Sequence, residues 1–406
     1  EMAQNQVRQE LDKLTAFNVT NGAVLVTNPK TGEILAMVGS RDYFDQARDG
    51  NVNVTTSLRQ PGSSIKVVNY AVALQSGFTP SSIISDTPIA YKNAWETYAP
   101  VNYDGRFHGN ITLRTALASS YNVPAVKVLA SYGVDKMVTM GKMMGITSWN
   151  DSSRFGLSLT LGGGEVKMTD MAVVYGTLAN LGKRVPLRPI LKVTNYQGKV
   201  LEESNCEEQA GAIVSAAENK TTCQPQQVLP ANVAYLLSDI LADNNARTPA
   251  FGPASYLVIP GHNVAVKTGT TNDKRDNWTI GYTNDFMVVV WVGNNDNSPM
   301  SAIASGVTGA SPIWHNIMVT LLQDQPTSYF EKPQDLIAIQ VCAINGLLPC
   351  EGCPTRVEYF LPGTEPKLHC DPEVMKKQKE EEEKKAKEEA EKKKQEGQIL
   401  NGVSTQ

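Results

Sequence analysis

Short, strongly apolar segments typical of β-strands occur in two groups that are far apart in the chain. The early group flanks a turn-forming Asn-Pro-Lys-Thr-Gly, as in a hairpin, and the late group follows more than half a chain later. The predicted strands are residues 23–27, 33–38, 264–268, 278–283 and 286–292. The sequence between the groups has helical spacing. The fold must therefore join strands from both ends of the body in one sheet and cover that sheet with helices.

The predicted helices follow from apolar residues that recur every three or four positions. They are residues 1–17, 63–75, 112–119, 123–132 and 168–181. The first is amphipathic, with Val7, Leu11 and Leu14 on one stripe, and is interpreted as a connector. The pair 112–119 and 123–132 leaves a short connection between two helices, which is a favourable place for side chains that point into a cleft.

The first motif with chemical meaning is Ser-Ser-Ile-Lys at residues 63–66. Ser63 and Lys66 are one helical turn apart, so their side chains share a face. A serine hydroxyl is a weak nucleophile at neutral pH and needs a base within reach. A lysine amine can be that base only when it is neutral, although its ordinary pKa is about 10.4. Burial and a second nearby cation both favour the neutral amine.

Two further motifs complete an acyl-transfer site that uses no histidine. Ser120-Tyr121-Asn122 falls in the predicted connection between two helices. Lys-Thr-Gly-Thr at residues 267–270 lies on a predicted strand of small residues that can hold a substrate carboxylate. Lys267 can also supply the second positive charge near Lys66.

Singly, Ser-x-x-Lys and Ser-x-Asn are common by chance, whereas Lys-Thr-Gly is rarer. A helix cap, a surface lysine and ordinary turn residues would explain the residues of the first two motifs. Together and in this order the three motifs resemble the penicillin-binding proteins and the related serine β-lactamases. The likeness extends from about residue 23 to residue 320 and includes further motifs: Arg-Gln-Pro-Gly at 59–62, Gly-Gly-Gly-Glu-Val at 162–166 and Lys-Thr-Gly-Thr-Thr-Asn-Asp at 267–273. These motifs resemble the bifunctional class A proteins, in which a glycosyltransferase domain precedes the transpeptidase domain.

The resemblance implies catalytic roles for four residues. Ser63 would be acylated and Lys66 would act as its base. Ser120 would relay a proton toward the leaving amine, with Lys267 as the neighbouring cation. β-Lactams would acylate the same Ser63, and neither a cofactor nor a metal would be required.

The resemblance also implies a substrate site. Asn122 would hold the substrate backbone, and Thr268, Gly269 and Thr270 would bind the acyl donor along the strand, with both threonine hydroxyls near its terminal carboxylate. Backbone N–H groups of Ser63 and Thr270 would form an oxyanion hole. The implied substrate is the D-Ala-D-Ala end of a peptidoglycan stem peptide, transferred to an amine on a neighbouring stem.

The implied fold class is α/β (α+β), in the form of the β-lactamase and transpeptidase fold. It has an antiparallel sheet of about five strands flanked by helices, plus a mainly helical subdomain that contributes Ser120 and Asn122. The active site would lie in the cleft between the sheet and this subdomain, with Ser63 at a helix N-terminus.

Two alternatives of different classes stay open. A DD-carboxypeptidase or β-lactamase-type hydrolase would share the acylation apparatus but also needs a base that activates water. The Glu-x-x-Leu-Asn pattern of β-lactamases is absent between residues 120 and 267, and Glu165, the nearest acidic candidate, has unsuitable neighbours in sequence. This favours the transpeptidase. A non-turnover β-lactam sensor would keep Ser63 and Lys66 and use acylation as a signal.

The cysteines lie outside the main motif region, in loop-like sequence: Cys206, Cys223, Cys342, Cys350, Cys353 and Cys370. Their even number suits an oxidising compartment and favours disulfides, whose pairing the sequence does not give. Free thiols are an alternative. The Cys-Glu-Gly-Cys spacing at 350–353 also permits zinc, with Cys342 and Cys370 completing four ligands.

Composition and residue spacing argue against a nucleic-acid partner, a histidine-based catalytic site and a membrane span. The formal net charge is -4 and the basic residues form no stripe over the body, so nucleic acid is not an expected partner. The four histidines are scattered, with no spacing typical of a histidine triad or a metal hydrolase: His108, His262, His315 and His369. No apolar run approaches the ~18 residues of a membrane span.

The sequence divides into four expected regions. Residues 1–20 are a linker helix from an upstream domain, 21–330 the transpeptidase domain, 331–371 a Cys-rich extension, and 372–406 a charged tail that is helical or disordered. Because the chain begins with Glu1 rather than Met, we interpret it as part of a longer bacterial protein. We expect that protein at the extracytoplasmic face of the cell membrane, with its anchor and its cell-wall synthesis partners outside this chain.

Overall fold

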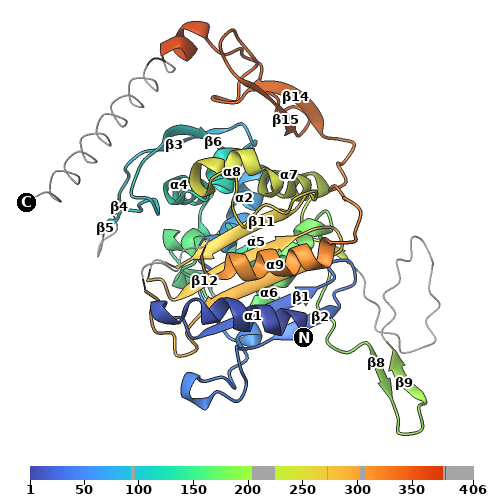
Figure 1. Ribbon diagram of the computed structural model, residues 1–406. Helices are drawn as coiled ribbons and strands as arrows, with labels where there is room; N and C mark the ends of the chain where they lie inside the picture. The colour runs from blue at the N-terminus through green and yellow to red at the C-terminus, as the bar shows by residue number, and fades with distance from the viewer. Residues whose placement is uncertain (93–96, 204–224, 272, 302–307, 378–379, 381–406) are drawn as a thin grey trace, which may run out of the picture.

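A computed structural model describes residues 1–92, 97–203, 225–271, 273–301, 308–377 and 380. At its centre is a five-stranded antiparallel sheet with the order β11-β12-β13-β1-β2 (Figure 1). The strands are β1 (Asn21–Thr27), β2 (Ile34–Val38), β11 (Ala265–Thr270), β12 (Asp276–Tyr282) and β13 (Met287–Gly293). Val24 of β1 pairs with Val290 of β13, so the two ends of the body meet in the middle of the sheet. The predicted fold class and sheet are confirmed.

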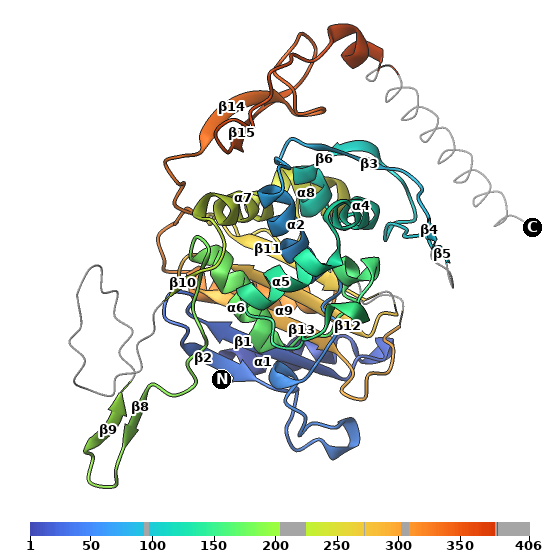
Figure 2. The same cartoon turned by 180° about the vertical axis from the view of Figure 1, so that it is seen from behind.

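Helices cover both faces of the sheet. α1 (Met2–Asp12) and α9 (Ala310–Leu322) lie on one face, and α2 (Lys66–Gln75), α5 (Val134–Met144) and α6 (Met168–Ala179) lie on the other (Figures 1 and 2). Alternate side chains of each central strand enter different cores. In β13, Val288 and Val290 pack with α1 and α9, whereas Val289 and Trp291 pack with the helices of the opposite face.

The predicted helix pair carrying Ser120 and Asn122 is present, with one difference in its boundary. α3 (Leu113–Ala118) begins after Thr112, whose side chain accepts a hydrogen bond from Thr115 N–H and caps the helix. α4 (Asn122–Tyr132) includes Asn122 as its first residue instead of leaving it in the connection. Pro124 fits there because its missing N–H falls in the first turn, where no helical partner exists.

The remaining helices and strands complete the helical side and the surface. They are α7 (Ala231–Ala242), α8 (Asn244–Phe251), β3 (Ile83–Asp86), β4 (Tyr91–Lys92), β5 (Thr97–Tyr98), β6 (Gly109–Thr112), β7 (Lys183–Arg184), β8 (Lys192–Thr194), β9 (Val200–Glu203), β10 (Gln226–Gln227), β14 (Ile337–Cys342) and β15 (Thr355–Phe360). Among the described ranges, no helix combines the length and the apolar character needed to cross a bilayer.

The N-terminal helix is a packed part of the body. Val7 and Leu11 of α1 are fully buried in the core that α1 shares with α9 and the sheet. Residues 1–20 thus supply a helix of the outer layer. The interpretation as a linker did not anticipate this, because an amphipathic linker and a packed outer helix have the same apolar stripe. Their connection to an upstream domain stays a prediction.

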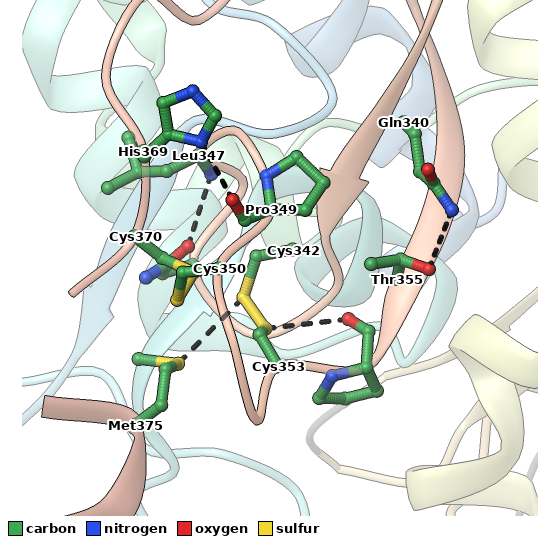
Figure 3. The surroundings of a disulfide bond; sticks show 12 residues. Gln340, Cys342, Leu347, Pro349, Cys350, Cys353, Thr355, His369, Cys370 and Met375 are labelled. Atoms are coloured by element: carbon green, nitrogen blue, oxygen red, sulfur yellow. Dashed lines mark hydrogen bonds between the residues drawn. A yellow bond between two sulfur atoms is a disulfide. The ribbon is translucent and has the colours of Figure 1, made fainter. Parts of the chain in front are cut away.

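The C-terminal extension is a small unit built around β14 and β15. Disulfides join Cys342 to Cys353 and Cys350 to Cys370 (Figure 3). The favoured disulfides are therefore confirmed for these four cysteines, and the alternatives of free thiols and zinc are wrong for them, because bonded sulfurs are not thiolate ligands. Cys206 and Cys223 lie outside the described residues, as does most of the charged tail 372–406.

The extension has little apolar core beyond its disulfides. Cys342, Cys370 and Met375 form its buried cluster. Replacing Cys342 and Cys353 together by serine should lower the free energy of unfolding of this unit by about 3 kcal/mol, because the bond closes a short loop in the unfolded chain. Hydrogen exchange should become faster in β14 and β15 and stay unchanged in β12 and β13. Unchanged protection of β14 would contradict this expectation.

Candidate active site

Ser63 lies in a tight turn that leads directly into α2. The turn Gly62–Ile65 is a 3-10 helix and α2 begins at Lys66, so the prediction of a regular α-helix from Ser63 is wrong in this detail. The residue before Ser63 is Gly62, whose backbone has a φ of +53°, in the left-handed region. A Cβ at Gly62 would lie 2.7 Å from backbone atoms of Thr270. Glycine thus allows the Ser63 turn to contact β11.

β11 contacts this turn through a second glycine, Gly269. A Cβ at Gly269 would lie 2.3 Å from Pro61 O and 2.9 Å from Ser64 N. Thr271 N–H donates to Asp276 O at 3.1 Å, and bonded and non-bonded pairs alternate along an antiparallel ladder. The N–H of Thr270 is therefore not used by β12 and is directed toward the open edge of β11. This is the edge that the Ser63 turn contacts.

Lys66 is completely buried and is held by neutral acceptors. Its Nζ donates to Ser120 O at 2.7 Å, to Tyr121 O at 3.1 Å and to Asn122 Oδ1 at 2.8 Å. Burial lowers the pKa of Lys66 well below its ordinary value, and the nearby charge of Lys267 lowers it further. These are the two causes that the sequence analysis required for a neutral amine.

Lys267 is the second buried amine of the site. Its Nζ donates to Ser120 Oγ at 2.6 Å and to Thr268 O at 2.8 Å. Burial lowers the pKa of Lys267 to about 7, and the charge of Arg247 in α8 contributes to the shift. Among the described residues, no carboxylate forms an ion pair with Lys66 or Lys267. Only neutral hydrogen-bond acceptors therefore offset the cost of charging them in a buried place.

Ser120 is presented to Lys267 by an unusual backbone conformation. Its φ is +62°, a left-handed value that is uncommon outside glycine. Hydrogen bonds to the end of α3 hold this conformation, from Ser120 N–H to Leu117 O and from Tyr121 N–H to Ala116 O, both at 3.1 Å. The backbone of Ser120 is therefore held by the end of α3.

Asn122 is fixed by a polar network that the sequence analysis missed. Asn102 Oδ1 accepts from Asn122 N–H at 2.8 Å, and Asn102 Nδ2 donates to both oxygens of the buried Asp86, at 2.9 and 2.7 Å. Asp86 Oδ2 also lies 2.7 Å from His108 Nδ1, and the ring of His108 stacks on Tyr121. His108 thus has a hydrogen-bond partner and supports the loop from outside the motifs.

The structure brings together all the residues that the motifs singled out. The two amines are buried, whereas Ser63, Ser120 and Asn122 are half-buried and reach solvent. Within the described residues, Ser63 Oγ has no hydrogen bond, so the predicted contact with Lys66 is not formed in this state; catalytic contacts are often loose without substrate.

The strand predicted to bind substrate is largely buried, and one basic residue near it was missed. Thr268 and Gly269 are buried, and Thr270 Oγ1 accepts from Asn277 Nδ2 at 3.1 Å. Arg247 escaped the sequence analysis because it lies in no recognised motif and approaches Lys267 only in the folded chain. The sequence offered no local signal for it.

Comparison with protein families identifies two matched regions. Residues 22–319 match the model of the penicillin binding protein transpeptidase domain, and residues 332–375 match that of the penicillin-binding protein 1A, C-terminal domain. The first match covers more than half of the chain. The second begins close to the expected start of the Cys-rich extension.

Individual relatives agree with the family models. The chain is 33% identical over 353 residues to penicillin-binding protein 1A of Aquifex aeolicus, covering 86% of this chain and 44% of that protein. It is 32% identical over 352 residues to penicillin-binding protein 2D of Bacillus subtilis, covering 84% of this chain and 47% of that protein. The chain thus spans less than half the length of these relatives.

A solved structure shares the fold. The crystal structure of penicillin-binding protein 1A from Haemophilus influenzae superposes with a TM-score of 0.74 at 27% sequence identity. The likeness covers 87% of this chain and 55% of that chain.

The pKa of Lys267 makes stability depend on pH in a defined direction. In the unfolded chain Lys267 is protonated up to about pH 10.4, whereas in the folded chain it loses its proton near pH 7. Between these values the unfolded state binds more protons, so the penalty for burying Lys267 declines as pH rises. Lys267→Met should be more stable than the wild type at pH 7, and the difference should shrink by pH 9.5. Urea unfolding of both proteins at pH 7 and pH 9.5 measures this difference in the free energy of unfolding. A difference that does not change with pH would contradict the low pKa of Lys267.

The contact between Gly269 and the Ser63 turn gives a second prediction. Gly269→Ala should lower the free energy of unfolding by about 1–3 kcal/mol, because its Cβ would overlap Pro61 O. Gly156→Ala is the matched control, since a Cβ at that position meets nothing within 4 Å. Urea unfolding of both variants is the measurement. Equal stability of the two would mean that the strand and the turn do not depend on close contact.

Proposed function

Because the chain belongs to the family of penicillin-binding protein transpeptidase domains, we propose that it is a serine DD-transpeptidase that cross-links peptidoglycan stem peptides. The observation that carries the proposal is that two buried lysine amines, neither paired with a carboxylate in the described part of the chain, both donate to Ser120, beside the turn that holds Ser63. Burial lowers the pKa of both amines, so they can exchange protons with the neighbouring serines near neutral pH.

The first half-reaction forms an ester on Ser63. Ser63 Oγ attacks the carbonyl carbon of the penultimate D-alanine and gives its proton to neutral Lys66. The bond to the terminal D-alanine then breaks, and the leaving nitrogen takes a proton from Ser120 Oγ, which regains one from the lysine pair. Backbone N–H groups of Ser63 and Thr270 stabilise the oxyanion, a contribution often worth about 3 kcal/mol.

The second half-reaction returns the enzyme to its starting state. An amine of a neighbouring stem attacks the ester carbonyl and loses a proton to the same base, and Ser63 Oγ leaves as the hydroxyl. One peptide bond, to the terminal D-alanine, is broken and one new peptide bond is formed, so the reaction needs no other energy source. An ester that survives until the amine arrives requires that water not be activated beside it.

Substrate would bind along the free edge of β11. The N–H of Thr270 at this edge can pair with an extended peptide in the manner of an added strand. Thr268 and Thr270 would contact the terminal carboxylate, and the Asn122 amide, which Lys66 and Val101 O already orient, would contact the donor backbone. A β-lactam would occupy the same edge and acylate Ser63.

The hydrolase alternative has less support from the site. A β-lactamase-type enzyme needs a base that activates water at the ester. In the described part of the chain, no carboxylate is hydrogen-bonded to Ser63, Lys66 or Ser120, and Glu165 is exposed. A DD-carboxypeptidase, a β-lactamase and a sensor that never turns over remain outcomes of the test below.

The surroundings of the whole protein are part of the proposal. On the resemblance to class A proteins, the full-length protein would also be a glycosyltransferase, anchored in the bacterial cell membrane with this domain on the extracytoplasmic face. Its partners would be stem peptides, β-lactams and other cell-wall synthesis proteins. The two disulfides of the extension suit that oxidising location.

Intact mass after incubation with benzylpenicillin tests the assignment of Ser63. The wild type should gain one drug mass and keep it for hours, whereas Ser63→Ala should gain none. Ser64→Ala is the matched control, because the neighbouring hydroxyl is buried and donates to Pro61 O, so it should still form the adduct. An adduct on Ser63→Ala would show that another residue is the nucleophile.

The time course separates the alternatives. Loss of the adduct with consumption of the drug would identify a β-lactamase. A stable adduct should be followed by incubation with a stem peptide ending in D-Ala-D-Ala and an amine acceptor, where a transfer product is expected. Release of D-alanine without transfer would identify a carboxypeptidase, and a stable adduct with no turnover of peptide would identify a sensor.

A further inference from the structure

The C-terminal extension reaches the helices behind the active site through a cluster of buried charges. Glu358 of β15 and Arg114 of α3 are each 1% exposed and form a two-pronged ion pair, with Nε to Oε2 at 2.7 Å and Nη2 to Oε1 at 2.5 Å. Arg114 Nη2 also donates to Asp239 Oδ2 of α7 at 2.6 Å. The cluster thus joins the extension to two helices of the body.

The same cluster reaches the start of α8. Asp243 Oδ2 accepts from Arg356 of β15 at 2.7 Å and from Arg114 at 3.3 Å. Asp243 Oδ1 caps α8 by accepting from Ala246 N–H at 3.0 Å. Ala246 O in turn accepts from the hydroxyl of Ser119, the neighbour of Ser120, at 2.9 Å. A chain of direct contacts therefore runs from β15 to the Ser120 loop.

A second contact of the extension reaches the other support of this loop. A Cβ at Gly346 would lie 2.4 Å from Ser81 O, so the extension touches the segment just before β3. β3 ends at Asp86, which holds Asn102 and, through it, Asn122. Figure 1 shows β14 and β15 lying over the helical side of the body, above α7 and α8.

We propose that the C-terminal extension positions the Ser120–Asn122 loop through the ion pair of Glu358 with Arg114. Arg114 lies four residues before the end of α3, and α3 holds Ser120 and Tyr121 through backbone hydrogen bonds. Glu358 and Arg114 are positioning residues, since neither contacts substrate. The extension is then a working part of the transpeptidase unit, and the proposal rests on the function proposed above.

A buried ion pair between two units costs desolvation free energy when both charges leave water. Replacing one with apolar residues of similar size is often neutral or stabilising, so its presence says little about stability. A two-pronged arginine–carboxylate pair fixes both distance and orientation, however. A fixed distance and orientation matter for the Ser120 loop, because a small displacement of Ser120 Oγ breaks its contact with Lys267.

The test separates binding from chemistry in the reaction with benzylpenicillin. Stopped-flow measurement on the complete chain gives the dissociation constant of the first complex and the rate constant of acylation. Glu358→Gln should lower the acylation rate constant by about tenfold, since positioning errors act on the chemical step. The dissociation constant should change less than twofold. Asp335→Ala is the matched control: it removes a contact between the extension and Asn232 of α7, away from α3, and should react as the wild type does.

A second variant keeps the proposal testable if Glu358→Gln folds poorly. Arg114→Met with Glu358→Met removes both partners of the ion pair; Asp243 keeps its bond to Arg356, and Asp239, which loses Arg114, is partly exposed to solvent. The variant should therefore fold and melt near the wild type while acylating about tenfold more slowly. Wild-type acylation by this double variant would overturn the proposal. So would equal losses in the double variant and in Asp335→Ala. A wild type that is never acylated would instead overturn the proposed function itself.

Discussion

The site depends on keeping two lysine amines away from both water and acid. Lys66 and Lys267 are buried, and their hydrogen-bond acceptors are backbone carbonyls, an amide and a hydroxyl. A carboxylate in either place would form an ion pair and hold the lysine protonated, so the lysine could not act as the proposed base. The surrounding fold therefore has to provide neutral acceptors in fixed positions, and it does so with the carbonyls of the Ser120 loop.

Close backbone contact is the means by which the sheet and the helical side share one site. Gly62 and Gly269 allow the Ser63 turn to lie against β11 without intervening side chains. The proposed nucleophile, Ser63, and the strand that would bind substrate are thereby placed close to each other. The lysines then enter from two different layers, Lys66 from α2 and Lys267 from β11.

The sequence predicted what depends on local pattern. The strands, the main helices and the motif residues carried signals within a few positions, and the five-stranded sheet followed from strands at both ends of the body. Asn102, Arg247 and Arg114 carried no such signal, because their partners are far away in the chain. The pairing of Cys342 with Cys353 was likewise beyond reach, since the six cysteines of the sequence permit many pairings. The 3-10 turn at Ser63 was missed because it follows from a contact with β11.

Burial of the central strands on both faces fixes more than stability. Ala265 of β11 packs with the helical side, and Val266 packs with α1 and α9 on the opposite face. Lys267 has the parity of Ala265, so it faces Ser120. Inserting or deleting one residue at the start of β11 would turn Lys267 to the far face and exchange the contents of the two cores. The length of β11 is therefore as constrained as the residues that form it, whereas a change in length of the exposed β8–β9 hairpin would reverse no buried face.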